Sequence, residues 1–329
     1  MRVGIVGASG AVGLEIIKLL ESRRFKLTSL SLFGSSKSAG RYLYFKKKRI
    51  QIKKLNKQGL KNLDLVFFSA GSNISEKFAN IAASYGAIVI DNSSAFRMNP
   101  KIPLIVPEIN PQDLIKSKSQ IIANPNCTTI ISLMAIKPLY DLSKIRRIVA
   151  TSFQSVSGAG NEGIEELLVN TSSFLKNKRG LNPVFKKEIA FNVIPKIGNF
   201  YKNLYSEEEM KLHNESRKIL SDKKINISAT TVRVPVIRSH SISLNIEFAS
   251  NVTVNNAVKA LKSFPGVKIE ASSKKISFPT PIEATERDYC IVGRLRRDFT
   301  RENSLSLWVV GDQIRKGAAL NAVQIAELL

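Results

Sequence analysis

Short apolar runs alternate with amphipathic stretches in the N-terminal part of the chain. Continuous apolar runs predict buried strands, and repeats near 3.6 residues predict helices. The predicted strands are residues 3–6, 27–33, 63–68, 87–91 and 120–123, and the predicted helices are residues 14–20 and 75–85. Between 34 and 61 the chain is basic and shows neither pattern, so we expect a meander there. Strands alternating with helices favour a parallel, doubly wound sheet of the Rossmann type.

The pattern changes after about residue 146, where longer β-rich segments dominate. The predicted strands are residues 147–154, 225–234, 240–248, 268–270 and 304–310, with helices at 162–176 and 207–221. This pattern predicts an α+β second domain whose broad sheet could also serve as a dimer surface. We place a nucleotide domain at 1–128, rejoined by the C-terminal segment 311–329, and a catalytic and dimerisation domain at 129–310.

Composition narrows the class of protein. The 329 residues contain no run of roughly 18 apolar residues, and Met1-Arg2 leads directly into the first strand, so we expect a cytoplasmic protein. Two cysteines, Cys127 and Cys290, do not form a disulfide framework. The two histidines, His213 and His240, show no ligand spacing with either cysteine, so we expect no metal.

The formal charge of +24 allows two interpretations. A basic excess is typical of proteins that bind nucleic acid or membrane surfaces. Here the basic residues are dispersed, apart from short runs at 46–49 and 294–297, and no nucleic-acid motif accompanies them. We therefore favour the second interpretation, in which the lysines are scattered over solvated faces. We expect no nucleic-acid and no membrane partner.

A glycine loop follows the first predicted strand and opens the first helix. Gly7, Gly10 and Gly13 have the spacing that permits a tight turn and lets a pyrophosphate rest on the helix N-terminus. The loop predicted to hold a dinucleotide comprises Gly7, Ala8, Ser9, Gly10, Ala11, Val12 and Gly13. A turn with only a structural role is the alternative.

The segment after the second strand indicates which dinucleotide is bound. An NAD site places a carboxylate there, but the chain has no carboxylate between Glu21 and Asp64. Hydroxyls and one cation stand in its place, which suits a 2′-phosphate and favours NADP. These residues are Ser35, Ser36, Lys37 and Ser38. Small residues at Ser69, Ala70 and Gly71, which end the next strand, would let the backbone approach the cofactor.

Cys127 is the candidate nucleophile. It lies between an apolar strand and a helix-like segment at 128–136, where the positive end of a helix would favour the thiolate. Cys290 falls in an apolar strand and is predicted to be inert. His240, between two strands, could shuttle a proton at neutral pH, whereas His213 lies on a strongly charged helix and is predicted to be solvated.

Several motifs, in matching order and spacing nearly end to end, resemble aspartate-semialdehyde dehydrogenase. They are Gly7-Ala-Ser-Gly-Ala-Val-Gly13, Asp91-Asn-Ser-Ser-Ala-Phe-Arg97-Met98, Val106-Pro-Glu-Ile-Asn110, Asn124-Pro-Asn-Cys127-Thr-Thr, Gln154-Ser-Val-Ser-Gly-Ala-Gly160, Glu208-Glu-Met-Lys211, Arg233 through His240, and Gly311-Asp312-Gln313. The resemblance implies NADPH-dependent reduction of L-aspartyl-4-phosphate to L-aspartate 4-semialdehyde through a cysteine thioester. That reaction belongs to the pathway to lysine, diaminopimelate, threonine and methionine, and the family implies a homodimer or a dimer of dimers.

The resemblance also implies residue roles. Cys127 would be the nucleophile, Gln154 would orient the substrate or acyl intermediate, and His240 would be the acid/base. The implied substrate residues are Arg97, Asn126 and Lys211 for the phosphate, Glu208 for the ammonium, and Arg233 for the α-carboxylate, while Ser157, Gly158 and Gln313 would extend the cofactor site. Glu208 is chosen over Glu207 and Glu209 only by its spacing from Lys211. Two departures from the common pattern are Lys37 for arginine and Phe153 for tyrosine.

Other functions fit parts of the sequence. N-acetyl-γ-glutamyl-phosphate reductase shares the cysteine chemistry, but the α-nitrogen of its substrate is acetylated and uncharged. Such a substrate would not require the carboxylate of Glu208. Glyceraldehyde-phosphate dehydrogenase lacks support because the acid expected for NAD is missing. A non-catalytic binding module would not need Cys127, Gln154 and His240 together.

Overall fold

The computed structural model describes residues 1–270 and 278–329, and they form two compact units. Met1–Asn126 and Ala318–Leu329 form the first unit, and Cys127–Gly317 form the second. The predicted boundaries differ slightly, because residues 127–128 and 311–317 group with the second unit instead of the first. Asp312 and Gln313 explain this grouping, since their side chains bond to Arg238 and Ser239.

The first unit is built on a seven-stranded sheet in the order β3-β4-β2-β1-β5-β6-β7. Every strand pairing in it is parallel except that of β3 with β4. The strands are β1 (Arg2–Val6), β2 (Ser29–Gly34), β3 (Tyr42–Phe45), β4 (Lys48–Lys54), β5 (Leu65–Phe68), β6 (Ile88–Asp91) and β7 (Ile121–Ala123). The helices are α1 (Ala11–Ser22), α2 (Ser72–Ser84), α3 (Gln112–Lys116) and α9 (Leu320–Glu327), with a 3-10 turn at Gln58–Leu60. The Rossmann-type parallel sheet is confirmed.

The C-terminal helix completes the core of this unit. Leu320 and Val323 of α9 join Ile16 and Leu19 of α1 in one buried cluster with Ile5 of β1. Burying a large aliphatic side chain contributes roughly 1.5–3 kcal/mol. Without α9, the apolar face of α1 and the central strands would be exposed to water.

The basic segment predicted as a meander contains a β-hairpin. β3 and β4 pair in antiparallel register, joined by Lys46 and Lys47, which both have positive φ. Hairpins favour two positive-φ residues, but Asn-Gly is the usual sequence there. The prediction was wrong because the turn has lysines and most positions of both strands are exposed or half-buried.

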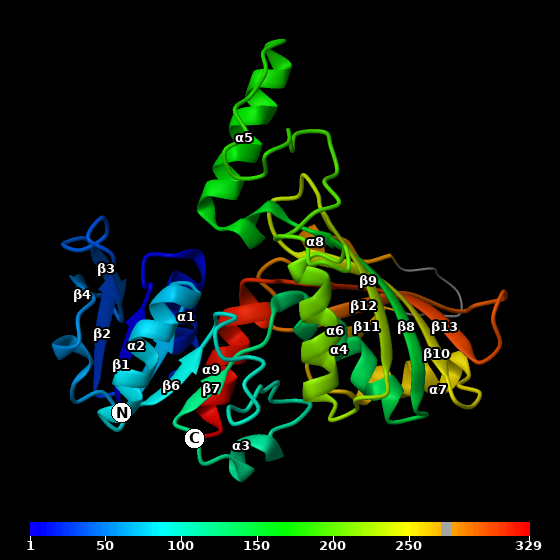
Figure 1. The fold of residues 1–329 in the computed structure, drawn as a ribbon, viewed down its shortest axis with the longest axis horizontal. Helices are drawn as coiled ribbons and strands as arrows, with labels where there is room; N and C mark the ends of the chain where they lie inside the picture. The colour runs from blue at the N-terminus through cyan, green and yellow to red at the C-terminus, as the bar shows by residue number, and fades with distance from the viewer. Residues whose placement is uncertain (271–277) are drawn as a thin grey trace. The chain divides into compact units, whose positions relative to one another are not determined.

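The second unit is a mixed six-stranded sheet in the order β11-β12-β13-β10-β8-β9 (Figure 1). Its strands are β8 (Ile145–Gln154), β9 (Asn226–Arg233), β10 (His240–Phe248), β11 (Val267–Ile269), β12 (Cys290–Arg297) and β13 (Ser304–Gly311). Its helices are α4 (Cys127–Tyr140), α5 (Asn161–Leu175), α6 (Glu207–Ile219), α7 (Val254–Ser263) and α8 (Pro281–Ala284), with a 3-10 turn at Val156–Ala159 and a π turn at Arg315–Ala319.

Four of these helices contact the sheet, whereas α5 extends away from it (Figure 1). α6 lies on β9, α7 lies on β11 and β12, α8 contacts β13, and α4 contacts β10, β12 and β13. α4 is buried along nearly its whole length. The structure thus holds the segment that starts at Cys127 rigidly inside the second unit. No helix among residues 1–270 and 278–329 is long and apolar enough to cross a membrane.

Candidate active site

One edge of the six-stranded sheet collects most of the predicted catalytic residues. β8 and β9 are parallel, and Gln154 and Arg233, the last residue of each, are register partners. β10 runs antiparallel to β8, so its first residue, His240, lies at the same edge. His240 in turn pairs with Gly311, the last residue of β13. Four strands therefore place their functional residues at one edge through register alone.

Cys127 is the first residue of α4 and is half-buried. The positive end of a helix stabilises a thiolate at this position. Gly317 flanks the thiol-bearing carbon, since a Cβ added at Gly317 would lie 2.9 Å from the Cβ of Cys127. Gly317 was not among the predicted site residues; its place in the turn after Gly311-Asp312-Gln313 was its one indication in the sequence.

Gln154 is buried and oriented by three oxygen atoms. Its Nε2 donates to Thr128 Oγ1 at 2.8 Å, to Ser152 Oγ at 3.3 Å and to Glu208 Oε1 at 3.3 Å. All three face the nitrogen, so the amide oxygen points away from them. Thr128 follows Cys127 in the chain, which ties the orientation of Gln154 to the start of α4.

The three consecutive glutamates at the start of α6 make different contacts. Glu209 closes a capping box with Ser206 and accepts from Thr231 N at 3.0 Å. Glu207 accepts from Asn199 Nδ2 at 3.2 Å. Glu208 is buried beside Gln154, and its Oε2 accepts from Lys211 Nζ at 3.1 Å. Helix geometry thus places Glu208 and Lys211 together, one turn apart on a single face.

Arg233 is a buried cation at the end of β9. Its Nη1 donates to the Ser155 carbonyl oxygen at 2.6 Å, and its guanidinium lies 5.7 Å from the ring centroid of Phe185. Burial lowers the pKa of Arg233, and the negative charges of Glu208 and Cys127 oppose that shift. A guanidinium stays charged in such a place, so it offers strong binding to a carboxylate.

His240 is completely buried at the start of β10. Ser155 holds its Nδ1, with the backbone nitrogen and the hydroxyl oxygen each at 3.1 Å. Burial, with a smaller effect from the charge of Arg233, lowers the pKa of His240 to about 3. His213 differs from its prediction as a solvated residue: it is half-buried, and its Nδ1 lies 2.8 Å from the carbonyl oxygen of Ile227.

The predicted cofactor residues of the second unit lie at the same edge. Gln313 Nε2 donates to Ser157 Oγ, and Gln313 Oε1 accepts from Ser239 N at 2.7 Å. Gly158 borders Arg233 and His240, because an added Cβ would lie 2.7 Å from Arg233 Nη1 and 3.4 Å from His240 Nε2.

The glycine loop of the first unit has the shape that a dinucleotide needs. Gly7 has φ +85°, and a Cβ there would lie 2.6 Å from the Ser69 carbonyl oxygen. A Cβ at Gly13 would collide with the Gly7 carbonyl. Gly10 is different, since its Cβ would meet only the Gly7 oxygen at 3.4 Å. The fold therefore requires Gly7 and Gly13, whereas Gly10 leaves the helix N-terminus open to a pyrophosphate.

The remaining predicted residues of the first unit lie where their strands end. Ser35, Ser36 and Lys37 are exposed directly after β2, and Ser38 is buried with its hydroxyl donating to Ser35 O at 3.2 Å. After β5, Ser69 Oγ donates to Val6 O at 3.0 Å, Ala70 is half-buried, and Gly71 has φ +83° at the start of α2.

Arg97 and Asn126 are buried in the first unit. Arg97 donates to the carbonyl oxygens of Asn124 at 2.9 Å and Asn92 at 2.7 Å, which braces the loop before Cys127. Asp91 starts the loop that carries Arg97. Burial raises the pKa of Asp91, while Ser75 and Ser93 donate to its carboxyl group at 2.5 and 2.6 Å and oppose that shift.

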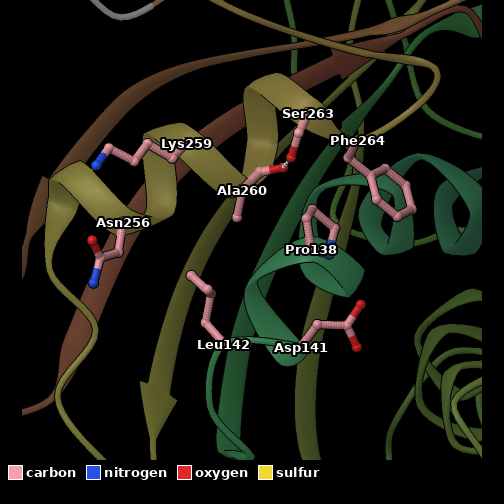
Figure 2. Close-up of a pocket in the computed structure, with 8 residues that line it drawn as sticks. All are labelled: Pro138, Asp141, Leu142, Asn256, Lys259, Ala260, Ser263 and Phe264. Atoms are coloured by element: carbon pink, nitrogen blue, oxygen red, sulfur yellow. Dashed lines mark hydrogen bonds between the residues drawn. The ribbon is translucent and has the colours of Figure 1, made fainter.

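A separate cavity of about 580 Å³ lies between the end of α4 and α7 (Figure 2). Its lining residues are Pro138, Asp141, Leu142, Asn256, Lys259, Ala260, Ser263 and Phe264. None of these residues was predicted to be functional, and Asp141 is paired with Lys137 at 2.5 Å. The lining contains no thiol or imidazole, so the reactive groups of the chain lie elsewhere.

Comparison with known proteins identifies the family. Residues 2–117 match the semialdehyde dehydrogenase NAD binding domain, and residues 136–316 match the semialdehyde dehydrogenase dimerisation domain. The aspartate-semialdehyde dehydrogenase of Synechocystis sp. is 47% identical over 329 residues, covering 100% of this chain and 97% of that protein. The chain belongs to the aspartate-semialdehyde dehydrogenase family.

Solved structures of the family agree in fold. Aspartate-semialdehyde dehydrogenase II from Vibrio cholerae is 40% identical, with a TM-score of 0.96 over 100% of this chain and 98% of that chain. A second structure of that protein is complexed with ASA. The predicted family, fold class and enzyme class are confirmed: the chain is an oxidoreductase of the aspartate-semialdehyde dehydrogenase family, and its first unit is a nicotinamide-nucleotide binding domain.

Proposed function

We propose that the chain reduces L-aspartyl-4-phosphate to L-aspartate 4-semialdehyde with NADPH, releasing phosphate. This step would serve the synthesis of lysine, diaminopimelate, threonine and methionine. The observation that carries the proposal is the sheet edge at which Cys127 stands near the buried charges of Arg233 and Glu208. Neither Cys127 nor Cys290 forms a disulfide, which suits a catalytic thiolate in a reducing cytoplasm.

The chemistry begins at Cys127. Its thiolate attacks the acyl carbon, a C–S bond forms, and the bond to the phosphate oxygen breaks. Phosphate leaves with that electron pair, and a thioester remains on Cys127. NADPH, when bound, supplies the hydride that reduces the thioester carbon. Collapse of the resulting tetrahedral intermediate then breaks the C–S bond, returns the thiolate and releases the aldehyde. His240 would donate a hydrogen bond or a proton to the oxygen of that intermediate.

The charges of the site complement those of the proposed substrate. Arg233 can bind the α-carboxylate, and Glu208 can accept from the α-ammonium. Gln154 can orient the acyl group, because its amide is fixed by Thr128, Ser152 and Glu208. For the phosphate we propose Lys211, Arg97 and Asn126. We propose no metal in this mechanism.

Cofactor choice rests on the loop after β2. Ser35, Ser36 and Lys37 are exposed there, and a hydroxyl-rich, cationic loop without a carboxylate suits a 2′-phosphate. We therefore propose NADP(H) over NAD(H). Lys37→Glu should raise the KM for NADP at least roughly tenfold while changing the KM for NAD little. Equal effects on both cofactors would contradict the choice of NADP.

The central experiment compares the two cysteines. NADPH formation from L-aspartate 4-semialdehyde, NADP and phosphate should disappear in Cys127→Ser, which should still bind NADP. Cys290→Ser is the matched control, because Cys290 is buried in β12 and should be dispensable for turnover. Turnover that survives in Cys127→Ser would refute the thioester route.

Glu208 separates the proposed substrate from its nearest rival. An N-acetylglutamyl substrate carries no α-ammonium, so a buried carboxylate would oppose its binding. Glu208→Gln should raise the KM for aspartate semialdehyde roughly a hundredfold, and Glu207→Gln, which alters a neighbouring exposed contact, is the control. Activity with the N-acetylglutamyl semialdehyde alone would move the chain to that rival function.

A second copy of the chain is the proposed partner, as a homodimer or a dimer of dimers. Residues 161–191, here called the α5 arm, expose a set of apolar side chains. They are Leu168, Val169, Phe174, Leu175, Leu181 and Phe191. A hollow of about 510 Å³ on the arm includes Val169, Leu181 and three glutamates. Several large apolar side chains exposed together on one segment are typical of an interface.

Charge along the arm favours a second copy as that partner. Glu162 and Glu165 lie near its start, and Lys176, Lys178 and Arg179 follow the end of α5. Two arms packed antiparallel around a two-fold axis would set the acidic end of each against the basic end of the other.

A further inference from the structure

Ser155 controls one side of the His240 ring. The Ser155 backbone nitrogen lies 3.1 Å from His240 Nδ1 with hydrogen-bond geometry. A backbone N–H can only donate, so Nδ1 must accept and cannot carry a hydrogen atom. The Ser155 hydroxyl, also 3.1 Å from Nδ1, can donate to the same lone pair.

The other ring nitrogen must then carry the hydrogen. A neutral imidazole has one N–H, so with Nδ1 as acceptor the hydrogen is on Nε2. Nε2 is buried and has no hydrogen-bond partner among the residues that the structure describes. It borders Gly158, where an added Cβ would lie 3.4 Å away, so the missing side chain leaves room beside this nitrogen.

The surroundings of the ring oppose a second proton. Burial is the largest effect, and the positive charge of Arg233 adds to it. Glu208 and the Ser239 backbone favour the protonated ring but act more weakly. Together with Ser155, these charged and polar groups face His240, and their net effect keeps the ring neutral near pH 7.

We infer that Ser155 is a positioning residue that holds His240 as the neutral Nε2–H tautomer, so that His240 acts as a hydrogen-bond donor and does not take the proton of Cys127. The inference rests on the proposed function only for the catalytic use of the Nε2–H donor. Its geometric basis is independent of that function, because it concerns only Ser155 and the ring.

The donor has a defined use in the proposed reaction. When the thiolate forms the C–S bond, the carbonyl π pair moves onto the oxygen, which can accept from Nε2–H. The pair returns to re-form C=O as the bond to the phosphate oxygen breaks. His240 keeps its hydrogen throughout. The Cys127 proton goes to solvent beforehand, and the N-terminus of α4 and the charge of Arg233 favour the resulting thiolate.

Nitrogen NMR of the whole protein tests the tautomer directly. The chain has only two histidines, so ¹⁵N-histidine labelling gives two imidazoles, and His240→Asn assigns them. We expect His240 to be neutral with hydrogen on Nε2 at pH 7, and to remain neutral down to about pH 5. A ring protonated at Nδ1, or a doubly protonated ring at pH 7, would overturn the inference.

Two Ser155 variants test its control of the ring. Ser155 has φ −62° and ψ 152°, which proline can adopt, so Ser155→Pro removes the amide hydrogen and puts its Cδ against the His240 ring in place of that hydrogen. We expect Ser155→Pro to lose the single Nε2–H tautomer and to lower kcat at least roughly tenfold. Ser155→Ala keeps the amide, so the Nε2–H tautomer should persist, and kcat should fall less than in Ser155→Pro because only the second donor to Nδ1 is lost. A Ser155→Pro protein with an unchanged imidazole spectrum would contradict the inference.

Failure of the inference differs from failure of the proposed function. Absence of activity with aspartate semialdehyde leaves the imidazole spectrum readable and refutes the reaction alone. Normal activity with an Nδ1–H ring refutes the tautomer alone. If Ser155→Pro does not fold, the spectrum of the unaltered protein still decides.

Discussion

At the scale of single residues, two glycines shape the site by lacking side chains. Gly158 leaves room for the Arg233 guanidinium and the His240 ring, and Gly317 leaves room for Cys127. Arg233 cannot easily move aside, because Nη1 is bonded to the Ser155 carbonyl at 2.6 Å. The positions of Arg233, His240 and Cys127 therefore depend on the absence of a side chain at Gly158 and Gly317.

Gly158→Ala should displace Arg233 and lower kcat/KM for aspartate semialdehyde at least roughly a hundredfold, because small misplacements are costly in an oriented site. The melting temperature should change little, since the added methyl group meets side-chain atoms and no backbone. Ala159→Ser, at the exposed neighbouring residue, is the control. Full activity in Gly158→Ala would show that Arg233 is not fixed.

His240 should make the protein less stable in acid. Its pKa is about 3 when folded, against an ordinary value of 6.5, so below pH 6.5 the unfolded chain binds a proton that the folded chain refuses. Stability therefore falls as pH drops from 6.5 toward 3, by about 2 kcal/mol at pH 5. Denaturant unfolding at pH 7 and 5 should show this loss, and His240→Asn should lack that part of it. Equal losses in both proteins would refute the low pKa.

Residues with distinctive chemistry could be predicted from sequence, whereas the residues that position them could not. Cys127, Gln154 and His240 lie in specific motifs and are found by residue type. Ser155 acts through its backbone nitrogen, and Gly317 acts by being small. Both depend on strand register and turn geometry, which a single sequence does not reveal.

At the scale of elements, strand direction assembles the site. Parallel β8 and β9 end at one edge, and antiparallel β10 begins there, so residues 154, 233 and 240 meet although they are far apart in sequence. α6 adds Glu208 through a capping box that fixes its first turn. The strands themselves were predictable from apolar runs, but not their order in the sheet.

The glycine loop between β1 and α1 predicts a contrast between two substitutions. Gly10→Ala adds a methyl group that the protein can accept, so stability should change by less than about 1 kcal/mol while the KM for NADP rises at least roughly tenfold. Gly13→Ala should destabilise the fold, because its methyl group collides with the Gly7 carbonyl. Thermal unfolding and cofactor titration separate the two effects. Unchanged cofactor binding in Gly10→Ala would argue against a pyrophosphate at this loop.

Several elements escaped prediction, among them the β3–β4 hairpin and α7. The hairpin turns at Lys46 and Lys47 without glycine or asparagine, and β4 is rich in lysine and mostly exposed. α7 begins at a Thr253 cap, whose side chain accepts from Asn256 N at 3.2 Å. The cap and the apolar positions Ala257 and Leu261, which are buried on one face, were the local indications of α7 in the sequence.

At the scale of the whole molecule, the α5 arm and the net charge bear on assembly. The arm exposes apolar side chains on an element that packs little on its own sheet (Figure 1). The charge of +24 disfavours random association through self-repulsion. Assembly should therefore depend on a defined apolar contact, and we find no structural reason for the basic excess itself.

Light scattering should give a mass about twice that of one 36.4-kDa chain, or four times if dimers pair. Phe174→Ser combined with Leu175→Ser should shift the mass toward one chain, because these exposed side chains would lose their apolar contact. Ile115→Ser, equally apolar and exposed on α3, is the control and should leave the mass unchanged. A double variant that stays assembled would place the interface elsewhere.

The unequal burial of the two cysteines has a practical consequence. Cys127 is half-buried at the start of α4, whereas Cys290 is fully buried in β12. A thiol reagent should therefore modify one cysteine per folded chain and two per unfolded chain. When two thiols are counted after unfolding, the count on the folded protein gives the fraction of chains whose Cys127 is accessible, before any substrate is added.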